Sequence, residues 1–295
     1  MRAKLTVQCG PFKHSRPCTP RADVLSHNEA WIIARFAVGV GVVALVALAG
    51  WRLKALTDSG AIAALGVGTA SVAAGAVWAL LLLFFFASSS ALSRLALPLS
   101  LSNGGPAFAA KGATRDAAQV LANGALFAVA ALGDALGGDG LGGAAAWSAL
   151  GVGALATATA DTWSTEVGTR WGGMPRDVVR WTRVLPGASG GITLAGTSAG
   201  ALGALLTWAV AHAMQFGVPV VAVVVGGLAG AFSDSVLGAT VQERRWCDRC
   251  GGATERRTHS CGAATRVSGG VKGFDNDAVN FASILIGASL TCLLS

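Results

Sequence analysis

Oxygen-bearing side chains stand at the ends of several long apolar runs in this sequence. The segments are ATADTWSTEVG with Asp161 and Glu166, GAFSDSV with Asp234, and GFDNDAVNFAS with Asp275, Asn276, Asp277 and Asn280. Carboxylate and amide oxygens are hard ligands that suit Mg²⁺, and a charge inside a bilayer is costly unless it has a partner. We therefore predict that Asp161, Asp234 and Asp277 share Mg²⁺, with Glu166 as a fourth catalytic acid and Asn276 and Asn280 in support.

A simpler interpretation is that these acids only end helices at the lipid headgroups, where charge costs little. It suits Asp161 and Asp275, which are expected at helix ends. It suits Asp234 least, because this residue lies about two turns inside an apolar run.

A second set of residues could bind phosphate at the same membrane level. Glycine-rich backbone before a helix offers free N–H groups to an anion, and basic or amide side chains can add to such a site. The candidates are Ser189, Gly190 and Gly191 in PGASGG, Arg183 just before them, and Arg115 and Asn123 in RDAAQVLANG. The alternative interpretation of PGASGG is a plain tight turn.

A third set of residues has the spacing of a metal site. Cys247-x-x-Cys250 and His259-x-Cys261 lie in one polar loop, WCDRCGGATERRTHSCG. Four soft ligands with this spacing match a closed tetrahedral zinc site that braces structure and does not catalyse. A reducing cytoplasm disfavours disulfides here, so the alternative is unpaired thiols.

The composition places these residues in a membrane protein. Of 295 residues, 53% are hydrophobic and only 13% are charged, too few charges to cover a soluble core of this size. The net charge of +7 would suggest nucleic acid in a soluble protein. Here Lys and Arg lie mostly between apolar runs, so they report topology, and we expect the lipid bilayer as a partner and no nucleic acid.

Apolar runs indicate about seven or eight short spans, hence an all-α, polytopic bundle. They cover approximately 31–50, 59–74, 76–94, 119–133, 142–160, 189–212, 217–240 and 275–294, with a break predicted at Gly75. Alternate loops are basic, which places them and the active site on the cytoplasmic side of the cytoplasmic membrane. Two of these loops, 161–188 and 241–274, are long. Residues 1–29 are expected to be a disordered basic tail before a membrane domain at 30–295.

With these residues assembled, the chain resembles the integral membrane family called domain of unknown function 92. The matching blocks include ATADTWSTEVG, PGASGGITLAGTSAGALGALL, GAFSDSVLGATVQ and GFDNDAVNFASILIGA, in this order, within roughly residues 30–295. The family includes a plant phytyl-phosphate kinase. The resemblance implies an isoprenyl-phosphate kinase, which moves a phosphoryl group from a nucleoside triphosphate, CTP or ATP, to a prenyl monophosphate such as phytyl or geranylgeranyl phosphate.

The residue pattern and the resemblance agree on the type of chemistry. A phosphate monoester is already mostly ionised near neutral pH, so its oxygen needs no strong base. Phosphoryl transfer depends chiefly on positioning and charge neutralisation, which acids with Mg²⁺ and phosphate-binding arginines can supply. Two other classes stay open: a transporter, which would place its polar residues near the membrane midplane, and another lipid-phosphate enzyme such as a cytidylyltransferase.

Overall fold

The computed structural model describes residues 27–100, 114–137 and 143–295. The chain separates into two compact units, residues 1–35 and 36–295, and the architecture below is that of the second unit. The expected tail, residues 1–29, lies almost wholly outside the described residues.

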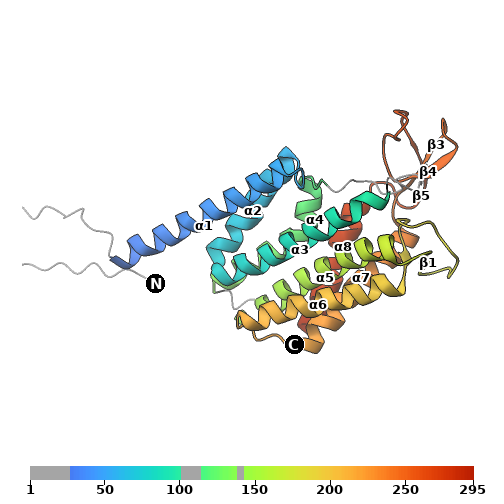
Figure 1. Cartoon of the computed structure of the whole chain (residues 1–295). Coiled ribbons are helices and arrows are strands. Elements are labelled where there is room, and N and C mark those ends of the chain that lie inside the picture. The colour runs from blue at the N-terminus through green and yellow to red at the C-terminus, as the bar shows by residue number, and fades with distance from the viewer. Residues whose placement is uncertain (1–26, 101–113, 138–142) are drawn as a thin grey trace, which may run out of the picture. The chain divides into compact units, whose positions relative to one another are not determined.

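Eight helices form the described part of the chain (Figure 1). Six of them are long and apolar enough to cross a membrane, α2 is a shorter apolar helix, and α5 is less apolar. The predicted all-α polytopic fold is therefore confirmed. The helices are α1 (His27–Arg52), α2 (Asp58–Ala74), α3 (Ala76–Ser100), α4 (Ala117–Ala135), α5 (Ala144–Trp171), α6 (Leu194–Ala213), α7 (Val220–Thr240) and α8 (Asn276–Leu293).

Local chemistry explains where several helices begin and end. Gly75 separates α2 from α3 as predicted, because it takes a φ of 131° that disfavours other residues. Asp116 caps α4 by accepting from the backbone N–H of Gln119, whose side chain reaches back to the Asp116 backbone in a capping box. Thr193 caps α6 in a similar way through the N–H of Gly196.

Two predicted boundaries are wrong. The helix expected to end near residue 160 continues as α5 to Trp171, so Asp161 and Glu166 lie inside a helix and not at its end. The helix expected from residue 189 begins only at Leu194, because Gly191–Ile192 pair instead with Arg176–Asp177 as short strands β2 and β1.

Helix α5 lies at the centre of the bundle and contacts α3, α4, α6, α7 and α8. All of its residues from Gly151 to Ala160 are buried. Most of these residues are Gly, Ala or Thr, which allow neighbouring helices to approach closely. Because α5 is covered by protein, it does not need the strongly apolar surface of a helix that faces lipid.

Small residues bring α5, α7 and α8 together along one seam. Positions Gly153 and Thr157 of α5 face Gly226 and Gly230 of α7 and Gly287 and Thr291 of α8. A Cβ atom at Gly287 would lie 2.7 Å from the carbonyl oxygen of Gly226, and one at Gly230 would lie 3.0 Å from that of Ser283. Since positions four residues apart share a helix face, the next seam positions are Asp161 in α5 and Asp234 in α7.

Contacts between helix ends define two opposite ends of the bundle. At one end, Thr57 donates its N–H to the Arg115 carbonyl at 3.0 Å and Arg94 donates to the Leu53 carbonyl at 3.2 Å. At the other end, Trp78 Nε1 donates to Asp134 Oδ2 at 3.0 Å. The first end also carries residues 172–193 and 241–275, and we call it the lobe end.

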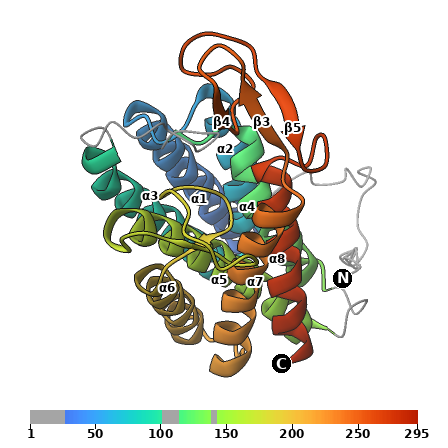
Figure 2. The same ribbon diagram turned by 90° about the vertical axis from the view of Figure 1, so that its right-hand side faces the viewer.

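Residues 241–275 form a small lobe beyond the ends of α7 and α8 (Figures 1 and 2). Its antiparallel sheet has the order β4-β3-β5, from Gly252–Thr254, Arg244–Cys247 and Arg266–Gly269. We call it the Cys/His lobe, because it contains the four cysteine and histidine residues predicted to bind zinc.

The seam predicts that Gly287→Ala destabilises the protein while Gly66→Ala does not. The new methyl at position 287 would collide with the α7 backbone, and overpacking of this kind costs about 1–3 kcal/mol. A Cβ at Gly66 meets nothing within 4 Å, so this substitution is a matched control in α2. Thermal unfolding in detergent should show a lower midpoint for Gly287→Ala alone. Equal midpoints for the two variants would contradict the packing described.

Candidate functional site

Asp161 and Asp234 come together at the lobe end of the α5/α7/α8 seam. Each is the next position of its helix along the seam, and both side chains are only partly exposed. Ser283 of α8 donates its hydroxyl to Asp234 Oδ2 at 3.3 Å. Two carboxylates at such a site repel each other unless a cation or a proton lies between them. The structure therefore brings these two acids to the same end of the seam, and the ion that they were predicted to share stays a prediction.

The first turns of α8 carry further oxygen-bearing side chains on the helix that contacts Asp234. Ser283 also donates to the backbone carbonyl of Asn280 at 2.8 Å, which links the start of α8 to Asp234. Asn276 lies one turn before Asn280 on the same helix face. Asp277 follows Asn276 in the first turn, with a partly buried side chain.

Asp275 precedes these residues and serves the helix itself. Its carboxylate accepts from the backbone N–H of Ala278 at 3.3 Å, which makes it the N-cap of α8. It also pairs with Arg257 of the Cys/His lobe at 4.0 Å. The structure thus gives Asp275 the helix-ending role that the simpler interpretation assigned to it.

Glu166 lies apart from Asp161 on the helix circumference. Glu166 is five positions after Asp161, which turns it about 140° away from Asp161. Glu166 faces α3 and accepts a hydrogen bond from the Ser93 hydroxyl at 2.5 Å. Asp161 and Glu166 therefore do not share one face of α5, and the four predicted acids do not form one cluster.

Arg115 joins Glu166 on this second face. Its guanidinium donates to the hydroxyls of Ser90 at 2.9 Å and Ser93 at 3.5 Å. Burial lowers the pKa of Arg115, and the nearby negative charge of Glu166 opposes that effect. The cluster of Ser90, Ser93, Arg115 and Glu166 is a polar site between α3, α4 and α5. Asn123, two turns along α4, donates its amide to the Gln119 carbonyl at 2.9 Å.

The glycine-rich stretch does not form the helix N-terminus that was predicted. The Gly191 N–H donates to the Ala188 carbonyl at 3.1 Å, and the Gly190 carbonyl accepts from Val178. Gly190 has a positive φ and packs on Ala239 of α7. The strand β2 and Thr193 then separate this turn from α6. The tight-turn interpretation describes this segment correctly.

Two predicted phosphate-binding side chains near this turn have different surroundings. The Ser189 hydroxyl donates to Glu255 Oε1 of the Cys/His lobe, so the turn and the lobe are joined. Arg183 is exposed and lies in the β1–β2 segment, where its backbone forms a bridge with Arg176. Arg183 is therefore available to an anion at the surface of the lobe end.

Sequence reasoning missed Ser93, Ser283 and Glu255. Ser93 belongs to the run ASSSALS inside an apolar segment, and Ser283 follows Asn280 by three residues in another. A hydroxyl side chain inside an apolar helix is a natural hydrogen-bond partner for a buried acid, and this signal could have identified Ser93 and Ser283. Glu255, which accepts from Ser189, stands in a charged loop with no distinguishing local pattern.

The four predicted zinc ligands converge in the Cys/His lobe. One ligand atom from each of Cys247, Cys250, His259 and Cys261 lies within 4.8 Å of the others. Neighbouring groups change the pKa values of these thiols. Hydrogen bonds from the Ala263 backbone and from His259 lower the pKa of Cys261 to about 6. The hydrogen bond with Cys261 is the main cause that raises the pKa of Cys250 to about 11.

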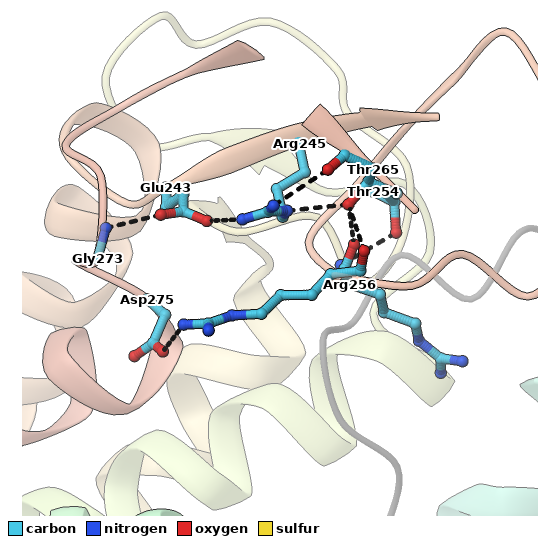
Figure 3. A network of polar contacts seen from close by, with 8 residues as sticks. Glu243, Arg245, Thr254, Arg256, Thr265, Gly273 and Asp275 are labelled. Atoms are coloured by element: carbon cyan, nitrogen blue, oxygen red, sulfur yellow. Dashed lines mark hydrogen bonds and ion pairs between the residues drawn. The ribbon is translucent and has the colours of Figure 1, made fainter. Parts of the chain in front are cut away.

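A polar network holds the base of this lobe (Figure 3). Glu243 accepts from the Gly273 N–H at 2.6 Å and from the Arg245 guanidinium. Arg245 also donates to the Thr265 hydroxyl at 2.9 Å. The Gly273 hydrogen bond is the main cause that lowers the pKa of Glu243. This network ties the start of the lobe to its last residues, which lead into α8.

Comparison with known proteins gives relatives along nearly the whole chain. Protein PGR of Arabidopsis thaliana is 28% identical over 291 residues, covering 88% of this chain and 96% of the plant protein. The uncharacterized membrane protein MJ0933 of Methanocaldococcus jannaschii is 34% identical over 100 residues, which is 33% of this chain and 42% of the archaeal protein. No solved structure matches the chain significantly.

The part of the chain that matches a known family includes both polar clusters on α5. The model of the family described as "Integral membrane protein DUF92" matches residues 41–288, a range that includes the Asp161–Asp234 pair, the Arg115–Glu166 cluster and the Cys/His lobe. The chain therefore belongs to the DUF92 family of integral membrane proteins.

Proposed function

We propose that this protein is a membrane-embedded phosphotransferase that moves a phosphoryl group from a nucleoside triphosphate to a prenyl monophosphate. We expect CTP as the donor, ATP as the alternative, and phytyl or geranylgeranyl phosphate as the acceptor. The observation that carries the proposal is that the seam between α5, α7 and α8 places Asp161 and Asp234, from two helices, at the lobe end of a membrane bundle.

The residues at this meeting point fit Mg²⁺. Asp161 and Asp234 supply hard carboxylate oxygens, and Asn280 and Asn276 continue the same seam on α8. When bound, Mg²⁺ would neutralise charge on the transferred phosphoryl group and on the nucleotide phosphates. The acids hold and orient the metal–nucleotide complex, and Ser283 fixes the Asp234 carboxylate by its hydrogen bond. Asp277, which was predicted to share the ion, lies in the first turn of α8 and forms no group of three metal-binding side chains with this pair among the described residues.

Positive charge collects where the phosphates would bind. Within residues 36–295, every Lys and Arg that the structure describes lies at the lobe end of the bundle or in its loops. This distribution supports a cytoplasmic orientation for the lobe end. It would also attract both anionic substrates, with Arg115 among the partly buried cations and Arg183 among the exposed ones.

An apolar groove beside Arg115 offers a place for the prenyl chain. The groove has a volume of about 510 Å³ and lies between α2 and α4, with Ile62, Val67, Leu121 and Ala125 among its lining residues. Ser59 and Ala117 mark its lobe end, next to the Arg115 backbone. A prenyl phosphate placed here would bring its headgroup to the polar cluster and leave its tail in apolar surroundings.

The same geometry weighs against a transporter. The acids and amides gather at one end of the bundle, whereas transporter sites lie near the bilayer midplane in discontinuous helices. A cytidylyltransferase would use a similar metal and nucleotide site, so product analysis must separate the two reactions: a prenyl diphosphate for the kinase and a CDP-linked lipid for the cytidylyltransferase.

Replacing Asp234 by Asn should abolish most of the activity. The substitution keeps the size of the side chain but removes a metal-binding charge, and we expect transfer to fall about 100-fold or more. In the assay, isolated membranes are incubated with geranylgeranyl phosphate, CTP and Mg²⁺, and the products are identified by mass spectrometry. Asp134→Asn, at the opposite bundle end, is the matched control and should retain activity. Wild-type rates in Asp234→Asn membranes would refute the proposed site.

Replacing Arg115 by Met should weaken binding of the prenyl phosphate. The loss of one charge-assisted hydrogen bond costs about 1.5–3 kcal/mol, so we expect KM for the acceptor to rise at least about tenfold. Arg94→Met removes an exposed arginine of α3 and serves as the control. Because Arg115 also faces Glu166, thermal unfolding of both variants must be measured alongside. An unchanged KM in a folded Arg115→Met protein would place the headgroup elsewhere.

A further inference from the structure

The Cys/His lobe is a folded unit with almost no apolar core. Among residues 244–269, the buried ones are Cys247, Thr254 and Thr265. Its strands contain only three or four residues each. A segment of this size buries too little apolar surface to order its backbone, and small folds of this kind depend on a disulfide or a metal.

Two similar turns face each other inside this lobe. The first contains Cys247 and Cys250 and ends in Gly251, and the second contains His259 and Cys261 and ends in Gly262. Both glycines have a positive φ, 61° and 81°, which a residue with a side chain rarely adopts. Each turn is closed by a backbone bond: the Gly251 N–H donates to the Cys247 carbonyl and the Gly262 N–H to the His259 carbonyl, both at 2.9 Å.

The turns aim three sulfur atoms and one imidazole nitrogen at a common point. Cys247 Sγ lies 3.7 Å from Cys261 Sγ, and His259 Nδ1 lies 3.3 Å from the same sulfur. All four cysteines of the described residues are free thiols, so no disulfide links the turns. Sulfur atoms at such separations can be the corners of a tetrahedron around one ion, since Zn–S bonds are about 2.3 Å long.

The donor set selects the metal. Three thiolates and one imidazole are soft and borderline ligands, which favour Zn²⁺ over the hard Mg²⁺ that suits Asp161 and Asp234. Four protein ligands complete a tetrahedron and leave no open position for substrate, which is the pattern of a structural and not a catalytic zinc.

We propose that Cys247, Cys250, His259 and Cys261 bind one Zn²⁺ ion that folds the Cys/His lobe and so fixes Glu255 against Ser189 at the edge of the candidate site. Glu255 follows β4 directly, and its bond to Ser189 joins the lobe to the turn that packs on α7. Arg257, two residues further, pairs with Asp275 at the start of α8. Loss of the ion would release both connections, because binding of a structural metal is coupled to folding.

Metal content of the full-length protein tests the site without any assay of catalysis. Protein purified in detergent under reducing conditions should contain about one zinc per chain by mass spectrometry of the metals. Cys250→Ser should lose most of it, while Cys292→Ser, a cysteine of α8 outside the cluster, should retain it. After exchange with Co²⁺, the wild type should show thiolate-to-cobalt charge transfer. Iron in place of zinc, metal-free wild-type protein, or equal zinc in both variants would overturn the proposal.

A second measurement keeps the test valid if Cys250→Ser fails to fold. Wild-type protein is treated with a nitrogen-donor chelator that takes zinc and leaves magnesium, and then with trypsin. Cleavage should begin at Arg249, Arg256, Arg257 and Arg266 in the lobe, while far-ultraviolet circular dichroism shows the helices unchanged. Excess Zn²⁺ should restore protection. A lobe that is equally resistant, or equally sensitive, before and after chelation would show that zinc does not fold it.

Discussion

The close approach of α5 to α7 and α8 is the constraint on which the candidate site depends. Glycines at 226, 230 and 287 leave no room for a Cβ, so the three helix backbones meet along the seam. Because helix faces repeat every three to four residues, the seam that brings small residues together inside the bundle also brings Asp161 and Asp234 together at its lobe end. The acids are adjacent because the packing below them is tight.

The opposite face of α5 carries a different kind of polarity. Glu166, Ser93 and Arg115 pair an acid with a base through a hydroxyl, so this cluster is close to neutral, whereas the Asp161–Asp234 pair is negative. A neutralised cluster can accept a phosphate by rearrangement of Arg115, and a negative pair can accept a cation. Helix α5 thus carries two polar sites of opposite charge character, and the proposed transfer would require both substrates to meet in line at the lobe end of this helix.

Sequence alone predicted about seven or eight helices, the break at Gly75 and the grouping of the Cys/His residues, because run length, backbone conformation and ligand spacing are local properties. It also placed Asp161 and Asp234 at one membrane level. Sequence reasoning failed where tertiary packing determines the structure. Helix α5 continues to Trp171 through polar residues because α3 and α6 pack against it. Position 190 is a glycine because Ala239 lies against it. The partner of Glu166, Ser93, is 73 residues away, and the proposed metal and phosphate roles stay predictions.

The two proposed metals need different ligands, and the fold places the two ligand sets in separate regions. Mg²⁺ needs oxygen ligands that can exchange with water and phosphate, and these lie at the end of a rigid helix seam. Zn²⁺ needs four fixed soft ligands, and these lie in a lobe that has little else to hold it. The Glu255–Ser189 and Arg257–Asp275 contacts connect the two regions. These contacts hold the lobe at the end of the bundle where α7 ends and α8 begins.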